Sequence, residues 1–235
     1  GDPIKWLSLA VQDALRTPVI TAIYGVIFAV IPWFIMYLVE MTGWHLVILP
    51  AIVCFMLVGP FLAAGLYDVS WELEKGHKPS FRHSLRAMRR NAVNEWGFGV
   101  LLMVMMIFWL RVASLIHALY PSYTETTIES LMPFLMLGTI AGGVFTLAML
   151  FITAFTQPIL MERKVDLATA LLTSVNAVWV NKVPMVIWGS IIFSAVAIGY
   201  VTGFIGFIVL MPIIGYASWH AYIDTISTKR ARKYV

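Results

Sequence analysis

The sequence predicts an all-α fold: a polytopic membrane helical bundle with six transmembrane helices, amphipathic interfacial helices and a threefold hairpin repeat. The first observation is composition, because 60% of the 235 residues are hydrophobic and only 12% are Asp, Glu, Lys or Arg. Soluble domains average about 25% charged residues. The second observation is a set of long stretches without charge, and the third is the gathering of basic residues in alternate polar segments. We therefore treat residues 1–235 as a single membrane domain.

Other classes of protein do not fit this composition. Disordered chains are poor in apolar residues and rich in charge, and a disulfide-stapled scaffold needs more than the single cysteine, Cys54. Strands of a membrane β-barrel alternate apolar and polar residues over about 10 positions, whereas the runs here are continuously apolar. The helical membrane class remains.

The positions of the six spans follow from the charge-free stretches. A helix rises about 1.5 Å per residue, so roughly 20 apolar residues cross the hydrocarbon core of a bilayer. The stretch 183–223 has 41 residues without a charge, and its central glycines, Gly199, Gly203 and Gly206, predict a tight helical hairpin. Arg111 interrupts another apolar run and is expected to reach the headgroups at one interface. The spans are expected at about 18–39, 45–67, 96–118, 132–157, 183–201 and 204–223.

The distribution of basic residues predicts the orientation of the chain. Fifteen of the sixteen Lys and Arg residues lie in the first, third, fifth and seventh polar segments, and Arg111 alone lies in an alternate one. Cytoplasmic loops carry the excess of Lys and Arg, so both termini are expected in the cytoplasm, with the protein in the bacterial inner membrane. The pI of 9.2 then reflects this bias, and no nucleic-acid partner is expected.

Three segments beside the spans have the apolar periodicity of amphipathic helices, and we expect them in the interface at about 4–17, 80–94 and 166–181. Ser80 and Asp166 supply helix start signals for the second and third segments.

The second of these helices carries the strongest basic cluster. Its arginines mostly share one side, opposite Phe81, Leu85 and Met88. We expect the helix to bind anionic lipid headgroups or a partner subunit, since each basic residue near an anionic surface contributes about 1 kcal/mol. A pure topology signal without binding is the alternative. The four residues are Arg82, Arg86, Arg89 and Arg90.

The even-numbered spans end in a similar way. Pro60, Pro158 and Pro212 all fall in their expected cytoplasmic halves. Together with the interfacial helices, this pattern predicts three copies of a unit made of interfacial helix, span, outer loop and span. The alternative is that surface helices and prolines recur in any chain with several spans.

One stretch resembles a known family. Residues 59–81 read GPFLAAGLYDVSWELEKGHKPSF, and the pattern G-L-Y…S…L-E-x-G-x-x-P within them is similar to the bacterial integral-membrane family called domain of unknown function 2189. The resemblance implies six spans and no established activity. The family often has Arg after the serine, where this chain has Trp71. Some members are labelled as relatives of cytochrome c oxidase subunit I, but these spans have too few histidines for haem–copper centres.

Polar residues give few candidates for chemistry. His220 and Asp224 are four apart and are expected to pair on one helix face, while His77 and His83 are expected to be solvated. Glu72 and Glu74 are expected to pair at the surface with Lys75, Lys78 or Arg82. The expected spans place no charge at mid-bilayer, which argues against an ion-coupled pump. We expect no catalytic residues, no cofactor and no metal.

Two hypotheses for function follow. The first is a non-catalytic accessory or scaffolding subunit that packs against a larger inner-membrane complex, such as a respiratory one, with protein partners and membrane lipids. The alternative is a small-solute or lipid transporter built from helical-hairpin repeats.

The expected fourth span contains small residues that let another helix approach closely. They are Gly138, Gly142 and Gly143.

Overall fold

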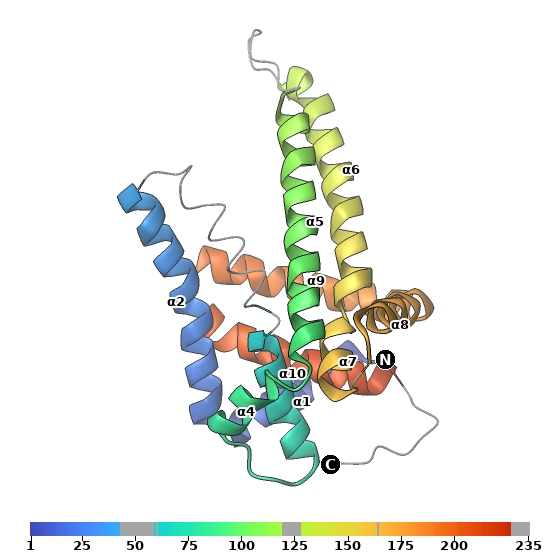
Figure 1. Ribbon diagram of the computed structural model, residues 1–235. Coiled ribbons are helices and arrows are strands. Elements are labelled where there is room, and N and C mark those ends of the chain that lie inside the picture. Colours follow the sequence, from blue (N-terminus) through green and yellow to red (C-terminus); the bar gives the residue numbers. More distant parts are fainter. Residues whose placement is uncertain (43–58, 60, 119–127, 164, 227–235) are drawn as a thin grey trace.

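The computed structural model describes residues 1–42, 59, 61–118, 128–163 and 165–226, and within these ranges it contains helices and no strand. The all-α class is therefore confirmed for this part of the chain. An unlabelled helix covers residues 61–74 and is called the central helix below. The labelled helices are α1 (Pro3–Arg16), α2 (Pro18–Thr42), α4 (Phe81–Ala87), α5 (Ala92–Ala118), α6 (Ile128–Thr153), α7 (Thr156–Glu162), α8 (Leu167–Val180), α9 (Lys182–Val201) and α10 (Phe207–Thr225) (Figure 1).

Side-chain caps fix the start of three short helices. Asp2 accepts hydrogen bonds from two backbone N–H groups at the start of α1, Ser80 caps α4 by accepting from His83 N, and Asp166 caps α8 by accepting from Thr169 N. Such caps satisfy N–H groups that have no partner inside the helix. The predicted start signals at Ser80 and Asp166 are confirmed. The interfacial location of these helices stays a prediction.

Four described stretches are long and apolar enough to cross a membrane. They are Pro18–Leu38, Ala92–Ala118, Glu129–Glu162 and Lys182–Val201, and each overlaps one expected span. The expected span 45–67 lies mostly outside the described residues. The expected span 204–223 is the helix α10, which carries polar residues in its second half and is not among the four. Six spans therefore stay a prediction.

A tight turn joins α9 to α10. Gly203 has φ +61° and Phe204 has φ 67°, in the left-handed region that glycine adopts without strain. A Cβ on Gly199 would lie 1.9 Å from the ring of Phe207, so the two helices approach too closely for a larger residue. The hairpin predicted from these glycines is confirmed.

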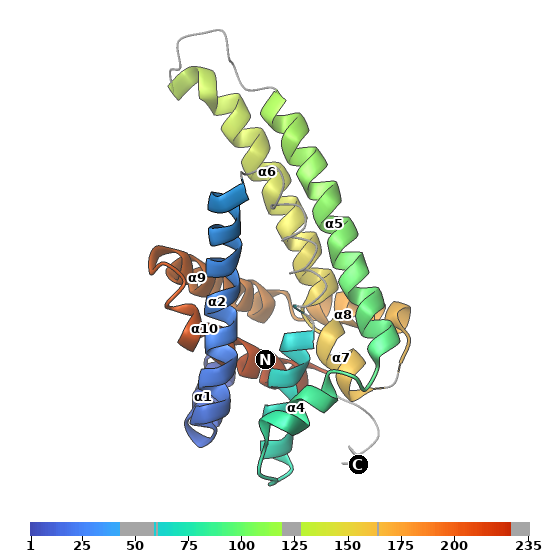
Figure 2. The same ribbon diagram turned by 60° about the vertical axis from the view of Figure 1, so that its left-hand side comes forward.

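The two described hairpins differ in direction. The α5–α6 hairpin is long and projects away from the other helices, while α9 and α10 run crosswise to it (Figures 1 and 2). The second half of the first predicted unit, at 45–67, lies mostly outside the described residues. The threefold repeat predicted from the sequence is therefore not confirmed.

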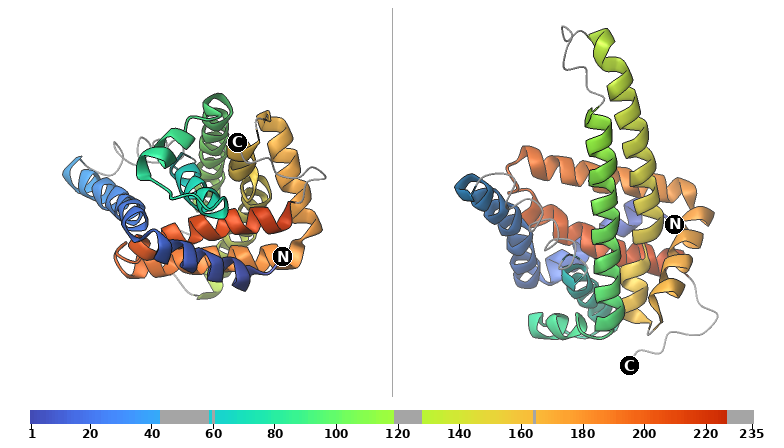
Figure 3. Two further views of the ribbon diagram at one scale, coloured as in Figure 1. Left: turned by 90° about the horizontal axis from the view of Figure 1, so that it is seen from below. Right: turned by 45° about the horizontal axis from the view of Figure 1, so that its top comes forward.

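The core lies at the base of the α5–α6 hairpin, where α1 runs beside α10 and α10 also packs against α2 (Figure 3). The contact between α2 and α10 is close, because a Cβ on Gly25 would lie 1.9 Å from the backbone oxygen of Ile208. Trp6 meets Trp188 edge-to-face at 5.7 Å between ring centroids. The fully buried Trp219 contacts the ring of Trp71 on the central helix.

Candidate functional site on the central helix

The central helix carries polar side chains into the core. All residues from 64 to 72 are buried, and Asp68, Ser70 and Glu72 are among them. Buried polar groups are costly unless they find partners. Asp68 and Glu72 are one helical turn apart and share a face, whereas Ser70 projects about 200° away from Asp68. The helix thus has two polar sides.

Asp68 contacts α4 and the turn that follows it. Its Oδ2 lies 2.7 Å from Nδ1 of His83, and its Oδ1 lies 3.5 Å from Nη2 of Arg90. The carboxylate is 1% exposed. Burial raises the pKa of Asp68 above its usual value, while the hydrogen bond to His83 and the charges of His83 and Arg90 oppose the rise.

Glu72 contacts the segment just after the central helix. It accepts a hydrogen bond from Lys75 Nζ at 2.9 Å and lies 3.1 Å from Nδ1 of His77. Burial alone raises the pKa of Glu72, but the bonds to Lys75 and His77 outweigh it, so the pKa is lowered. The ammonium of Lys75 also lies 3.8 Å from the centroid of the Trp71 ring.

Three ligand-bearing groups meet in this cluster. One ligand atom each from Asp68, Glu72 and His83 lie within 4.8 Å of one another, and carboxylate with imidazole is a set that divalent cations accept. Each carboxylate already has a positive partner, however, in Arg90 or Lys75. These contacts account for both charges, so we call Asp68, Glu72, Lys75, His83 and Arg90 the ion-pair cluster and assign no metal to it.

The other side of the central helix contacts both ends of the chain. Ser70 Oγ donates to Asp13 Oδ2 of α1 at 2.8 Å, and the same oxygen lies 2.8 Å from Nε2 of His220 on α10. Asp13 is 6% exposed. One buried carboxylate therefore joins three helices.

The predicted pair of His220 and Asp224 is wrong. His220 bonds to Asp13, and Asp224 accepts a hydrogen bond from Trp6 Nε1 at 2.9 Å. Both residues do share a face of α10, but that face packs against α1. Partners on the neighbouring helix replace the contact expected within α10.

The four arginines do not form one surface. Arg82, Arg86 and Arg89 are exposed, whereas Arg90 belongs to the ion-pair cluster and its guanidinium lies 4.7 Å from the Trp71 ring centroid. The reason is that α4 ends at Ala87 and α5 begins at Ala92, so the helical spacing assumed for 80–94 does not continue. Lipid or partner binding by the three exposed arginines stays a prediction.

The predicted packing glycines lie on α6. A Cβ on Gly142 would lie 3.5 Å from the Trp109 ring of α5, and one on Gly138 would lie 4.0 Å from Ile116. A Cβ on Gly143 would meet nothing within 4 Å among the described residues. Gly138 and Gly142 therefore face α5, while Gly143 faces away from the described chain.

Other sequence predictions have mixed outcomes. Glu72 does pair with Lys75, but it is buried rather than at the surface. His83 was expected to be solvated and instead contacts Asp68. Cys54 lies outside the described residues.

Several polar residues were missed by the sequence reasoning. Asp13, Asp68 and Ser70 have long-range partners that no local pattern indicates. Glu95 was placed just before a span and is fully buried in the first turn of α5. The sequence did contain one signal for the ion-pair cluster. Asp68 and Glu72 are acids one helical turn apart, and residues 61–73 contain no other charged residue.

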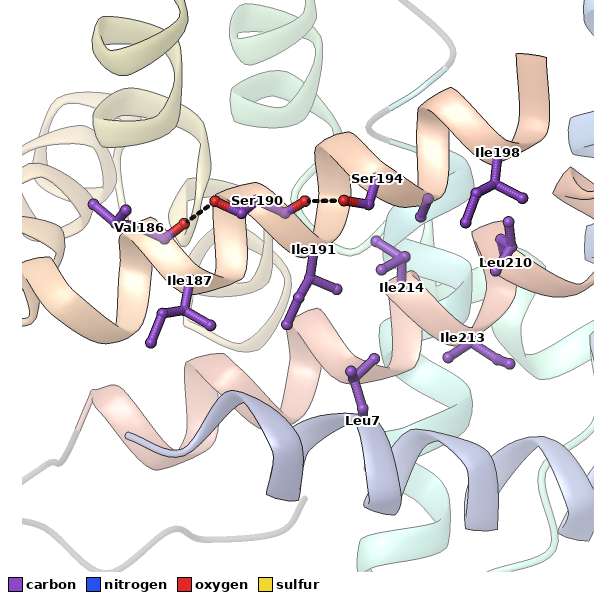
Figure 4. A pocket seen from close by; sticks show the side chains of 11 residues that line it. Leu7, Val186, Ile187, Ser190, Ile191, Ser194, Ile198, Leu210, Ile213 and Ile214 are labelled. Carbon is purple, nitrogen blue, oxygen red and sulfur yellow. Dashed lines mark hydrogen bonds between the residues drawn. The ribbon is translucent and has the colours of Figure 1, made fainter. Parts of the chain in front are cut away.

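A separate groove lies between α1, α9 and α10 (Figure 4). Its volume is about 490 Å³. The hydroxyls of Ser190 and Ser194 donate to backbone oxygens of their own helix, so the groove offers an apolar wall. The apolar side chains include Leu7, Ile187, Ile191, Ile198, Ile213 and Ile214.

Residues 48–162 match the model of a family described as predicted integral membrane protein (DUF2189). This segment contains the central helix, α4, α5, α6 and α7, and with them the whole ion-pair cluster. No curated protein matches the chain. No solved structure matches it either.

Proposed function

Because residues 48–162 match the model of the DUF2189 family of predicted integral membrane proteins, we propose that the chain is a member of this family and a non-catalytic accessory or scaffolding subunit. It packs against a larger complex in the bacterial inner membrane, with both termini in the cytoplasm. Fifteen of sixteen basic residues on one side support this orientation.

The exposed α5–α6 hairpin carries the proposal. Only 11% of the apolar window of α5 is buried, and none of the window within Glu129–Glu162. At about 1.5 Å per residue, the 27 residues of α5 extend roughly 40 Å, which exceeds a hydrocarbon core of about 30 Å. Most of the apolar surface of this hairpin therefore lies outside the protein's own core.

One face of α6 suits a partner helix. Gly143 has open space beyond it, and Ile140, Val144 and Leu147 are all exposed. In a bilayer, helices associate through close packing at small residues, because lipid tails are as apolar as the side chains. A helix of the partner complex is expected to dock across Gly143.

The test is purification from native membranes in mild detergent, followed by identification of co-purifying membrane proteins. Gly143→Ile fills open space and should leave the thermal midpoint unchanged while reducing partner recovery at least tenfold. Val183→Phe, at another exposed apolar position (72% exposed), is the matched control and should retain the partner. A wild-type protein that purifies without any partner, or equal recovery from both variants, would contradict the proposal.

The groove favours one form of the alternative. Its apolar wall matches a lipid acyl chain better than a polar solute, so lipid transport or lipid carriage is the second candidate. Purification from native membranes in mild detergent also distinguishes the accessory-subunit proposal from the lipid alternative. A stoichiometric lipid that is lost on Ser190→Trp, with no partner protein recovered, would favour the alternative.

A further inference from the structure

Glu95 is a buried acid without a partner in the described part of the chain. It lies in the first turn of α5 and has an exposed fraction of 0%. Neither carboxylate oxygen has a hydrogen-bond partner among the residues that the structure describes. Nothing in the ion-pair cluster or in the proposed docking face uses this residue.

The elements packed against α5 supply no described counter-charge. α8 contains no charged residue, and α6 carries only Glu129, at the end far from Glu95. On α7, Glu162 lies 3.5 Å from Arg163 and accepts a hydrogen bond from Tyr222. The charged residues of the central helix are acids, and Arg90 pairs with one of them. On α5 itself, Arg111 is exposed and more than four turns away.

An ionised carboxylate is disfavoured in this place. Removing it from water without a cation or a hydrogen bond costs more than the weak attraction of a helix N-terminus returns. A protonated carboxyl carries no net charge, so keeping it away from water costs much less than burying the ionised form.

We propose that the buried carboxyl of Glu95, in the first turn of α5, is a proton-binding site in which Glu95 is a neutral carboxylic acid at neutral pH. The site is independent of the accessory role. Its ligand is a proton rather than a metal cation, because a single carboxyl offers fewer oxygen ligands than a divalent cation requires.

Infrared difference spectroscopy of the protein in bilayers at pH 7 tests the proposal. Glu95→Gln should remove one carbonyl band of a protonated carboxyl, with the thermal midpoint unchanged because Gln has nearly the same shape. The matched control is Glu129→Gln, in the first turn of α6 and exposed, which should remove a carboxylate band. Loss of a carboxylate band on Glu95→Gln would overturn the proposal.

Chemical labelling provides a second, independent measurement. An apolar carbodiimide adds to a protonated membrane carboxyl, and the adduct rearranges to a stable N-acylurea without a further reactant. Labelling at Glu95 should exceed that at Glu129 at least tenfold at pH 7 and decline as the pH is raised. Protection by sodium chloride but not by choline chloride would identify a cation site instead and overturn the proton assignment. Equal labelling of both residues would overturn it as well.

Discussion

Asp68 and Glu72 lie one turn apart on the central helix, yet their surroundings move the two pKa values in opposite directions. The raised pKa of Asp68 means that its protonated form favours the fold, and this contribution is lost as pH rises through the folded value. The lowered pKa of Glu72 means that its ionised form favours the fold. That contribution is lost as pH falls from the ordinary value of 4.5 through the lower folded value.

Glu72→Gln tests this difference. At pH 7 the substitution leaves the ammonium of Lys75, whose side chain is 4% exposed, without its carboxylate partner. We expect a loss of about 1–3 kcal/mol in unfolding free energy, the range for hydrogen bonds to charged groups. The measurement is thermal or denaturant unfolding in detergent across pH.

The difference between variant and wild type should shrink as the pH falls below 4.5, because Glu72 is then protonated in both the folded and unfolded wild type. Glu74→Gln is the control, since Glu74 is exposed and receives the indole of Trp219 at 3.4 Å. Its effect should be smaller at every pH. An equal loss from the two variants would mean that burial of Glu72 does not strengthen its pairing.

At the scale of the element, α4 and the turn after it contain arginines of two kinds: exposed ones, and Arg90, which belongs to the ion-pair cluster. Replacing Arg82, Arg86 and Arg89 with Gln should lower binding to vesicles containing anionic lipid, at about 1 kcal/mol per residue before screening. Stability should change little, because the three side chains are exposed. Co-sedimentation with anionic and neutral vesicles measures the binding.

Arg90→Gln should behave in the opposite way. Removing its charge leaves Asp68 with only His83, so the thermal midpoint should fall while vesicle binding changes less. If all four substitutions reduced vesicle binding equally, Arg90 would belong with the other three. The basic segment would then form a single surface after all.

Local features of the elements were predictable from the sequence. The caps at Ser80 and Asp166 and the hairpin turn at Gly203 depend on residues a few positions apart. Charge-free length likewise located three of the four apolar helices, and the fourth, α5, was placed across the interruption at Arg111. In each case the feature is determined by residues within one segment, so the sequence of that segment is enough to predict it.

Contacts between elements were not predictable in this way. The end of α4 at Ala87 moved Arg90 away from the other arginines, and helical spacing gave no sign of that end. Asp13, Ser70 and His220 meet across three helices, and no periodicity relates them. The His220–Asp224 prediction failed for the same reason, since stronger partners came from α1.

For the whole molecule, the distribution of basic residues predicts opposite membrane sides for the loop after the central helix and the start of α6. In a Cys54→Ala background, His77→Cys should react with an impermeant maleimide only from the cytoplasmic side. Glu129→Cys should react only from the outer side. Both original side chains are exposed, so reagent access does not limit the result. Labelling of both positions from one side would overturn the assigned orientation.

The packing of α1 against α10 sets a delay in biogenesis. Trp6 and Asp224, which bond to each other, are 218 residues apart. At about 5–20 residues per second, the ribosome needs roughly 10–40 s to synthesise the second partner after the first. Until α10 is made, the nascent α1 lacks the helix that covers most of its apolar face. A transcript truncated anywhere in between therefore yields a chain with that face uncovered, a ready signal for the proteases that clear incomplete membrane proteins.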